Sequence, residues 1–352
     1  MIDLRTDTVT RPTEAMLDSM REATLGDDSR DGDTTVGKLE GLAAALMGKE
    51  AGAYMPSGTM TNLVAVLTHT PRGGEVLLEP GAHILHSELG GVTALAGAFY
   101  RGIPGKRGAM DIDALGEAIH PGTRNNFGTA LVCMETTHNR TGGAVLPLGH
   151  MKAVYDLAQR NGIPVHTDGA RIFNAAVALG VEAKEIARHT DTVGFCVSKG
   201  LSAPVGSVLC GSAPFIERAR AYRRMVGGNM RQAGPLAAAG IVALETMIPR
   251  LAEDHDTAKR LAEGLHRIDP GLCDPRHVET NLVRVDLRKS GRRAAQWSED
   301  LKKKGVLVAP ADAWSLRFVT HRHVSAPDVD AAVAAFAECW RYLSLDRGAH
   351  QP

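Results

Sequence analysis

The chain has 352 residues, of which 44% are hydrophobic and 23% charged, values that are ordinary for a globular enzyme. Its 40 Lys and Arg residues balance its 40 Asp and Glu residues, which argues against nucleic acid or an anionic membrane as the main partner, because both favour basic proteins. The N-terminus lacks the apolar core of a signal peptide, and the five dispersed cysteines form no CxxC pair. We therefore expect a cytoplasmic protein with reduced thiols and without a metal site.

The chain up to residue 249 predicts an arm followed by a large α/β domain. Residues 1–36 predict an irregular arm with one short amphipathic helix at Glu14–Glu22. From residue 37 to 249, helices alternate with short β-rich runs, which favours a mostly parallel sheet with helices on both faces. The expected strands are Glu75–Leu78, Ala130–Met134, Val165–Thr167, Thr192–Val197 and Ser207–Cys210, and the expected helices are Lys38–Met47, Thr59–Thr68, Leu148–Gln159 and Ala233–Thr246.

Residues 250–352 predict a small C-terminal α+β domain. A charged helix at Arg250–Arg267 leads into it, and the last residues, Gly348–Pro352, are expected to fray. Between them, a β-α-β-β-α order is expected over Asn281–Asp286, Ala294–Lys304, Val306–Val308, Ser315–Thr320 and Ala326–Tyr342.

Two charged residues follow apolar runs in the middle of the chain. Asp168 and Lys199 each come after such a run, so both side chains should emerge at strand ends inside the domain. A buried Asp or Lys is costly unless something pairs with it. Pyridoxal 5′-phosphate (PLP) pairs with both, because it takes a lysine amine as a Schiff base and needs an acid to keep its pyridine nitrogen protonated. Taken singly, Asp168 could instead cap the following helix and Lys199 could be a surface lysine.

A candidate phosphate cradle lies at an earlier helix start. Ser57, Gly58 and Thr59 precede or open a predicted helix, where backbone N–H groups and hydroxyls can hold a phosphate. Many helices begin with Ser or Thr, so this signal gains weight only beside Lys199 and Asp168.

Three further residues are candidates for the same site. His83 comes just after the expected strand Glu75–Leu78 and could stack on the pyridine ring and serve as an acid or base, or be a structural histidine. Arg171 could meet the ring hydroxyl or a substrate carboxylate. Arg317 could clamp an α-carboxylate, or be a surface strand arginine.

Along nearly its whole length the chain resembles the low-specificity L-threonine aldolases, which belong to the aspartate-aminotransferase (fold type I) superfamily. The matching segments are Ile2–Pro12, Gly26–Asp28, Thr35–Glu40, Pro56–Thr59, Glu88–Gly91, Glu135–Asn139, Asp168–Asn174, Ser198–Leu201 and Gly227–Gln232. The resemblance implies a large PLP-binding domain with a mostly parallel seven-stranded sheet and a small C-terminal domain. It also implies retro-aldol cleavage of a β-hydroxy-α-amino acid to glycine and an aldehyde.

The resemblance also assigns roles to residues. It implies that Lys199 forms the Schiff base, that Asp168 partners the pyridine nitrogen and that His83 stacks on the ring. It places the phosphate on Gly58 and Thr59 and the substrate carboxylate on Arg171 and Arg317. Members of the family are usually homotetramers of catalytic dimers, in which Arg231 would approach the phosphate from the neighbouring subunit.

The departures from the family pattern surround the substrate. Thr6 stands where relatives often have Ser as a carboxylate contact, and Arg30 stands where they usually have Tyr. Arg124–Gly128 contains no histidine where many bacterial relatives carry a second one. Arg30 could favour an acidic substrate such as a β-hydroxyaspartate. Other PLP-dependent reactions of a small amino acid, namely β-elimination, racemisation and transamination, remain alternatives.

Overall fold

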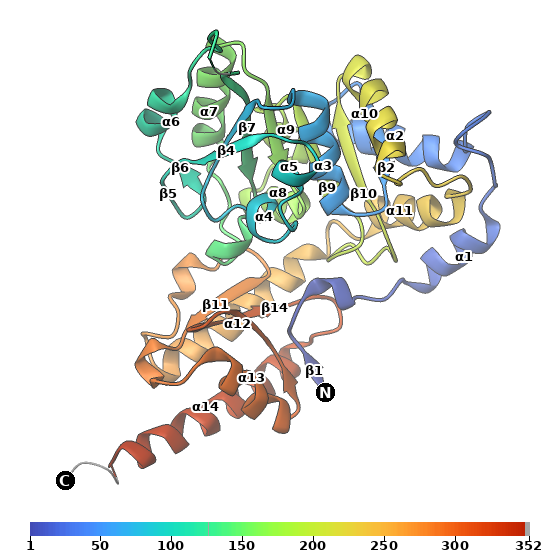
Figure 1. Cartoon of the computed structure of the whole chain (residues 1–352). Helices are drawn as coiled ribbons and strands as arrows, with labels where there is room; N and C mark the ends of the chain where they lie inside the picture. The colour runs from blue at the N-terminus through green and yellow to red at the C-terminus, as the bar shows by residue number, and fades with distance from the viewer. Residues whose placement is uncertain (126, 349–352) are drawn as a thin grey trace. The chain divides into compact units, whose positions relative to one another are not determined.

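The computed structural model describes residues 1–125 and 127–348 (Figure 1). Asn126, in the stretch without a second histidine, and residues 349–352 of the expected tail lie outside the described residues. The chain divides into two compact units. One comprises Met1–Thr10, Arg140–Ala144 and Arg250–Pro352, and the other comprises Arg11–Asn139 and Val145–Pro249. The division into an arm, a large domain and a small domain at residues 36 and 249 stays a prediction.

A seven-stranded sheet forms the centre of the larger unit. Its spatial order is β2 (Ala51–Met55), β10 (Ser207–Gly211), β9 (Thr192–Cys196), β8 (Val165–Asp168), β7 (Thr129–Glu135), β3 (Glu75–Leu78) and β4 (Phe99–Gly102). Strand β10 is antiparallel to both of its neighbours, and the pairs from β9 to β4 are parallel. The mostly parallel sheet expected from the sequence is therefore confirmed.

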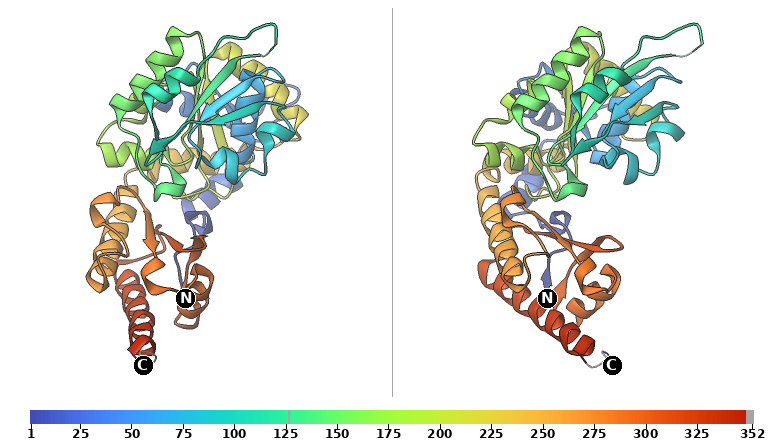
Figure 2. Two further views of the ribbon diagram at one scale, coloured as in Figure 1. Left: turned by 60° about the vertical axis from the view of Figure 1, so that its left-hand side comes forward. Right: turned by 90° about the vertical axis from the view of Figure 1, so that its left-hand side faces the viewer.

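Helices cover both faces of this sheet (Figure 2). Successive strand residues point to opposite faces: a Cβ on Gly52 would meet the backbone of α2, whereas Ala53 packs into a cluster with residues of α3 and α10. The unit contains α1 (Glu14–Glu22), α2 (Thr34–Met47), α3 (Gly58–His69), α4 (His83–His86), α5 (Gly91–Ala94), α6 (Ile112–Ala118), α7 (Leu148–Arg160), α8 (Ile172–Leu179), α9 (Ala183–Ala187), α10 (Ala213–Met225) and α11 (Gly234–Thr246), with a small hairpin of β5 (Gly105–Lys106) and β6 (Ala109–Met110).

The smaller unit combines helices with two short sheets. Its three-stranded antiparallel sheet has the order β11 (Leu282–Asp286), β14 (Ser315–Val319) and β13 (Ala309–Asp312), and its helices are α12 (Leu251–Ile268), α13 (Ala294–Lys303) and α14 (Ala326–Gly348). Its core includes Trp297 and Phe336, whose rings stack with centroids 4.6 Å apart.

Two expectations for the ends of the chain are corrected in this unit. The arm is not irregular at its start, because β1 (Ile2–Asp3) pairs in parallel with β12 (Val306–Leu307). A strand of two residues is too short to show a periodic pattern, so no sequence pattern predicts it. Helix α14 ends at Gly348 and not at Tyr342.

Among the described residues, no single helix is long and apolar enough to cross a membrane, although the bent pair α11 and α12 passes on length and composition alone. All five cysteines are free thiols.

Candidate active site

The residues predicted to bind the cofactor come from one edge of the large sheet. Asp168 ends β8 and lies beside Glu135 at the end of β7 and Gly194 of β9. Strand β9 then leads into Lys199, while Met55 at the end of β2 is paired with Ser207 of β10. Because the carboxyl ends of the parallel strands share this edge, Asp168, Lys199 and the start of α3 are brought to the same side of the sheet.

Asp168 is a buried acid, 3% exposed, with both carboxylate oxygens hydrogen-bonded. Its Oδ2 accepts from Nδ2 of Asn62 at 2.9 Å, and its Oδ1 accepts from the backbone N–H of Ala170 at 3.0 Å. The alternative that Asp168 caps the following helix is wrong, because α8 begins after Arg171 and has no side-chain cap. One carboxylate oxygen is therefore held by the local turn at Ala170, and the other by Asn62 of α3.

Asn62 reaches Asp168 because α3 lies directly against the sheet. A Cβ on Gly194 would come within 2.4 Å of Cγ2 of Thr61, so only glycine allows helix and strand to approach this closely. Nδ2 of Asn62 donates to Asp168 and also to Oε1 of Glu88, at 2.7 Å. The amide therefore bridges two buried carboxylates.

His83 joins this cluster through Glu88. Nδ1 of His83 lies 3.0 Å from Oε1 of Glu88. One ring nitrogen of His83 and one carboxylate oxygen each of Glu88 and Asp168 lie within 4.8 Å of one another. Burial lowers the pKa of His83, but the bond to Glu88 and the nearby carboxylates outweigh it and raise the pKa above its usual value. For the Glu88 carboxyl, by contrast, burial raises the pKa. Such a donor set can hold a metal ion, but the Asn62 amide already accounts for the closeness of the carboxylates.

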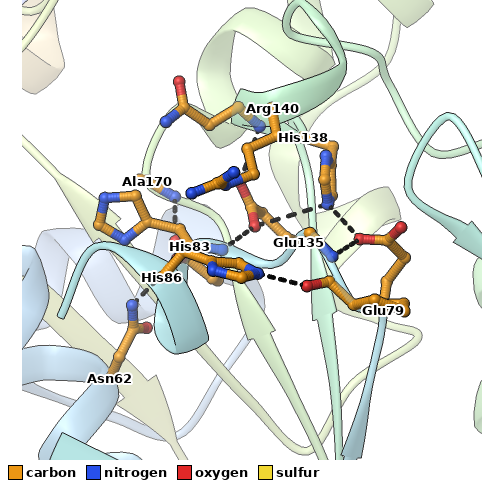
Figure 3. A network of polar contacts seen from close by, with 12 residues as sticks. Asn62, Glu79, His83, His86, Glu135, His138, Arg140 and Ala170 are labelled. Atoms are coloured by element: carbon orange, nitrogen blue, oxygen red, sulfur yellow. Dashed lines mark hydrogen bonds and ion pairs between the residues drawn. The ribbon is translucent and has the colours of Figure 1, made fainter. Parts of the chain in front are cut away.

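Glu135 fixes the position of the segment that carries His83. Its carboxylate accepts the backbone N–H groups of His83, at 2.6 Å, and of Asn139, at 2.7 Å. Figure 3 shows the neighbouring network, in which His138 is directed toward both Glu79 and Glu135, at 3.0 and 3.8 Å. Burial raises the pKa of Glu135.

The start of α3 has the features of a phosphate cradle. Ser57 is the N-cap in extended conformation, and its hydroxyl accepts from the N–H of Met60. Gly58 opens the helix so close to β9 that a Cβ would lie 2.9 Å from Sγ of Cys196. The exposed Ser57 and Thr59 and the first amide groups of the helix can therefore bind an anion, which the positive end of the helix dipole favours.

Lys199 lies in a turn between β9 and β10 and not at the start of a helix. It is half-buried, its carbonyl accepts from the N–H of Ser202, and the hydroxyl of Ser198 is bonded to the carbonyl of Gly206. Arg171, also half-buried, stands at the start of α8. A positioned amine, a buried acid and an anion cradle on one sheet edge match the three groups of PLP that a protein must hold.

Four further predicted residues are described by the contacts they make within their own units. Arg231 and Arg30 are exposed at the surface of the larger unit and approach the same oxygen of Asp27, at 3.3 and 3.9 Å. Thr6 and Arg317 belong to the smaller unit, where Thr6 caps a short 3-10 turn at Asp7–Val9 and Arg317 stands on β14 and donates to the carbonyl of Arg5. Their contacts with substrate stay predictions.

Sequence reasoning did not single out Asn62 or Glu88 as site residues. Glu88 carried a weak signal, since it begins the segment Glu88–Gly91 that matches the family pattern. Asn62 showed no sequence signal of a functional role, because a polar residue inside an apolar helix does not indicate which group it contacts.

This fold and site define a PLP-dependent enzyme of fold type I. Residues 3–290 match the family described as β-eliminating lyase. The chain is 43% identical to a probable low-specificity L-threonine aldolase 2 of Arabidopsis thaliana, over 95% of this chain and 96% of that one. It is 42% identical to the low specificity L-threonine aldolase of Escherichia coli (strain K12), over 97% of this chain and 98% of that one. The chain belongs to the β-eliminating lyase family and, within it, to the low-specificity L-threonine aldolases.

A solved structure agrees with the fold. The threonine aldolase of Leishmania major is 17% identical and superposes with a TM-score of 0.81, covering 97% of this chain and all of the other.

Proposed function

We propose that this chain is a PLP-dependent aldehyde-lyase that cleaves β-hydroxy-α-amino acids of the L-threonine and L-allo-threonine type to glycine and an aldehyde. The observation that carries the proposal is the convergence of Asp168, Lys199 and the start of α3 on one sheet edge, in a chain of this family.

The chain's own residues divide the work of holding the cofactor. Lys199 supplies the amine, Asp168 holds a proton at the pyridine nitrogen, and Ser57, Gly58 and Thr59 bind the phosphate. His83 would cover the ring, Arg171 would bind beside it, and Arg231 would reach the phosphate from a neighbouring subunit. When bound, the cofactor serves as an electron sink for the bond that breaks at Cα.

Substrate binding and proton transfer use side chains around this core. Arg171 and Arg317, with Thr6, hold the α-carboxylate, and each charge-assisted contact contributes about 1.5–3 kcal/mol. His83 takes the β-hydroxyl proton, directly or through water. Because its Nδ1 faces the Glu88 carboxylate, Nδ1 carries the proton in the neutral ring and Nε2 is the basic nitrogen.

The test is product analysis with the purified protein, PLP and L-threonine. The proposal expects glycine and acetaldehyde in equal amounts, and it expects Lys199→Ala to abolish both. Ammonia with a 2-oxo acid would indicate β-elimination, a D-amino acid would indicate racemisation, and pyridoxamine phosphate would indicate transamination. A protein that shows no borohydride-sensitive visible absorption with PLP would contradict every PLP-dependent reaction.

We also propose a homotetramer of catalytic dimers in the cytoplasm. The exposed side chain of Arg231, with 63% of its surface accessible in a single chain, is available to a second subunit. The free thiols of all five cysteines suit a reducing compartment. Light scattering of the purified protein measures the assembly, and a mass of one subunit would contradict it.

A further inference from the structure

A continuous line of buried hydrogen bonds ends on Asp168. Nε2 of His69 lies 2.9 Å from Oγ1 of Thr192, which lies 3.0 Å from Nδ1 of His166. Nε2 of His166 lies 3.1 Å from Oδ1 of Asn62, whose Nδ2 donates to Asp168. His166 is 0% exposed, Thr192 1% and Asn62 3%, so water does not compete for the bonds among these three residues, whereas His69 at the outer end is only partly buried.

The donors and acceptors along this line can be assigned from one end. Nδ2 of Asn62 donates to both Asp168 and Glu88, which places the amide oxygen toward His166. An amide oxygen only accepts, so Nε2 of His166 must carry the ring proton. Turning the amide over would direct its oxygen at two carboxylates, and their repulsion selects the observed orientation.

The remaining protons follow from the neutrality of the two histidines. Burial lowers the pKa of His166 to about 4, so the ring is neutral near pH 7 and its Nδ1 accepts. The proton on that bond therefore comes from the hydroxyl of Thr192. Burial also lowers the pKa of His69 to about 3. The His69 ring packs against Phe215, with centroids 4.3 Å apart, and its Nε2–H donates to Thr192.

Every bond in the line thus donates in the direction of Asp168. Hydrogen bonds aligned in this way polarise one another in a low-dielectric interior, and their positive ends face the carboxylate. Loss of any member would leave a buried donor or acceptor unsatisfied next to the site.

We propose that His166 and Thr192 are positioning residues that lock the Asn62 amide, so that its N–H group holds the Asp168 carboxylate charged and oriented toward the pyridine nitrogen of the cofactor. This inference rests on the proposed role of Asp168 as partner of that nitrogen. It adds a function to a histidine and a threonine that act on Asp168 through Asn62.

The first test needs no variant and no cofactor. In the apoprotein labelled with ¹⁵N-histidine, NMR should show His166 as a neutral ring with its proton on Nε2. A proton on Nδ1, or a ring that is charged at neutral pH, would overturn the proposed direction of the line.

The second test uses a matched pair at one position. Thr192→Val removes the hydroxyl and keeps the shape, whereas Thr192→Ser keeps the hydroxyl. We expect Thr192→Val to weaken PLP binding about tenfold, the effect of losing one hydrogen bond that acts on a charged group, and Thr192→Ser to stay within about twofold of the parent. With ¹⁵N-labelled PLP, the pyridine nitrogen signal should move toward the unprotonated position in Thr192→Val only.

A third variant separates geometry from simple packing. His166→Gln keeps an N–H group near Nε2 and should retain more PLP affinity than His166→Phe, which fills the space and donates nothing. If Thr192→Val and His166→Phe bind PLP with the parent's affinity and nitrogen signal, the inference fails and the proposed function stands. If the parent protein itself binds no PLP, the proposed function fails.

Discussion

His83 is tied to Glu88, a carboxylate that is itself buried beside Asp168, with Nδ1 of the histidine 3.0 Å from Oε1 of the glutamate. The pairing sets the tautomer of His83 and leaves Nε2 as its basic nitrogen. It also determines the pH at which this ring loses its extra proton, and that pH can be measured.

The pH dependence of the reaction should reflect this pairing. Burial lowers the pKa of His83, but Glu88 and its neighbouring carboxylates raise it above its usual value of about 6.5. A base must be unprotonated, so kcat/KM for glycine release should fall as the pH decreases through the raised pKa of His83. In Glu88→Gln the carboxylate is lost, and the midpoint should move to lower pH by about one unit. An unchanged midpoint would show that His83 is not the base that limits the reaction.

Space at Gly58 should control phosphate binding. Gly58→Ala would place a Cβ 2.9 Å from Sγ of Cys196, and such overpacking costs about 1–3 kcal/mol. The start of α3 must then shift, so we expect PLP affinity to fall about tenfold, measured by titration of the apoprotein.

Two controls belong to the Gly58 experiment. The double variant Gly58→Ala/Cys196→Ala removes the clashing sulfur and should recover most of the affinity. Pyridoxal without phosphate should bind the parent and Gly58→Ala equally. An equal loss for both ligands would mean that the substitution disturbs more than the phosphate cradle.

Much of this site could be predicted because strand ends leave a clear pattern. Asp168 and Lys199 follow apolar runs, and apolar runs of this kind become buried strands whose ends share an edge. Strand β2 was missed because its sequence, Ala51–Met55, contains two alanines and a glycine, which favour strands poorly. Strand β4 was missed because all four of its residues are exposed at the sheet edge, so no alternation of polarity exists there.

The contacts of Asn62 could not be predicted for a different reason. They depend on how closely α3 packs against Gly194 of β9. This packing joins segments that are more than 100 residues apart in the sequence. The same holds for the hydrogen bond that the backbone N–H of His83 donates to Glu135, which joins the start of α4 to the end of β7.

Glu135 should contribute to the stability of the folded protein. Its two oxygens each accept a backbone N–H, from His83 and Asn139, and a glutamine offers only one accepting oxygen. Glu135→Gln should lower the free energy of unfolding by about 1–3 kcal/mol, because a buried N–H group loses its acceptor. Denaturant unfolding of the apoprotein measures this change. Lys152→Ala, which removes an exposed ion pair with Asp156, is the matched control and should change stability by less than about 0.5 kcal/mol.

Arg30 should decide between neutral and acidic substrates. Its side chain is 76% exposed, and its Nε lies 3.9 Å from Oδ2 of Asp27. The same oxygen of Asp27 also pairs with Arg231. Exposed ion pairs of this kind are weak, which leaves the guanidinium able to bind a second acidic group on a substrate. We expect Arg30→Tyr to reduce kcat/KM for β-hydroxyaspartate relative to L-threonine about tenfold, and Arg30→Lys, which keeps the charge, to reduce this ratio less. The measurement is glycine release from both substrates under identical conditions. If the ratio is the same in the parent and in Arg30→Tyr, the charge at position 30 has no part in substrate choice.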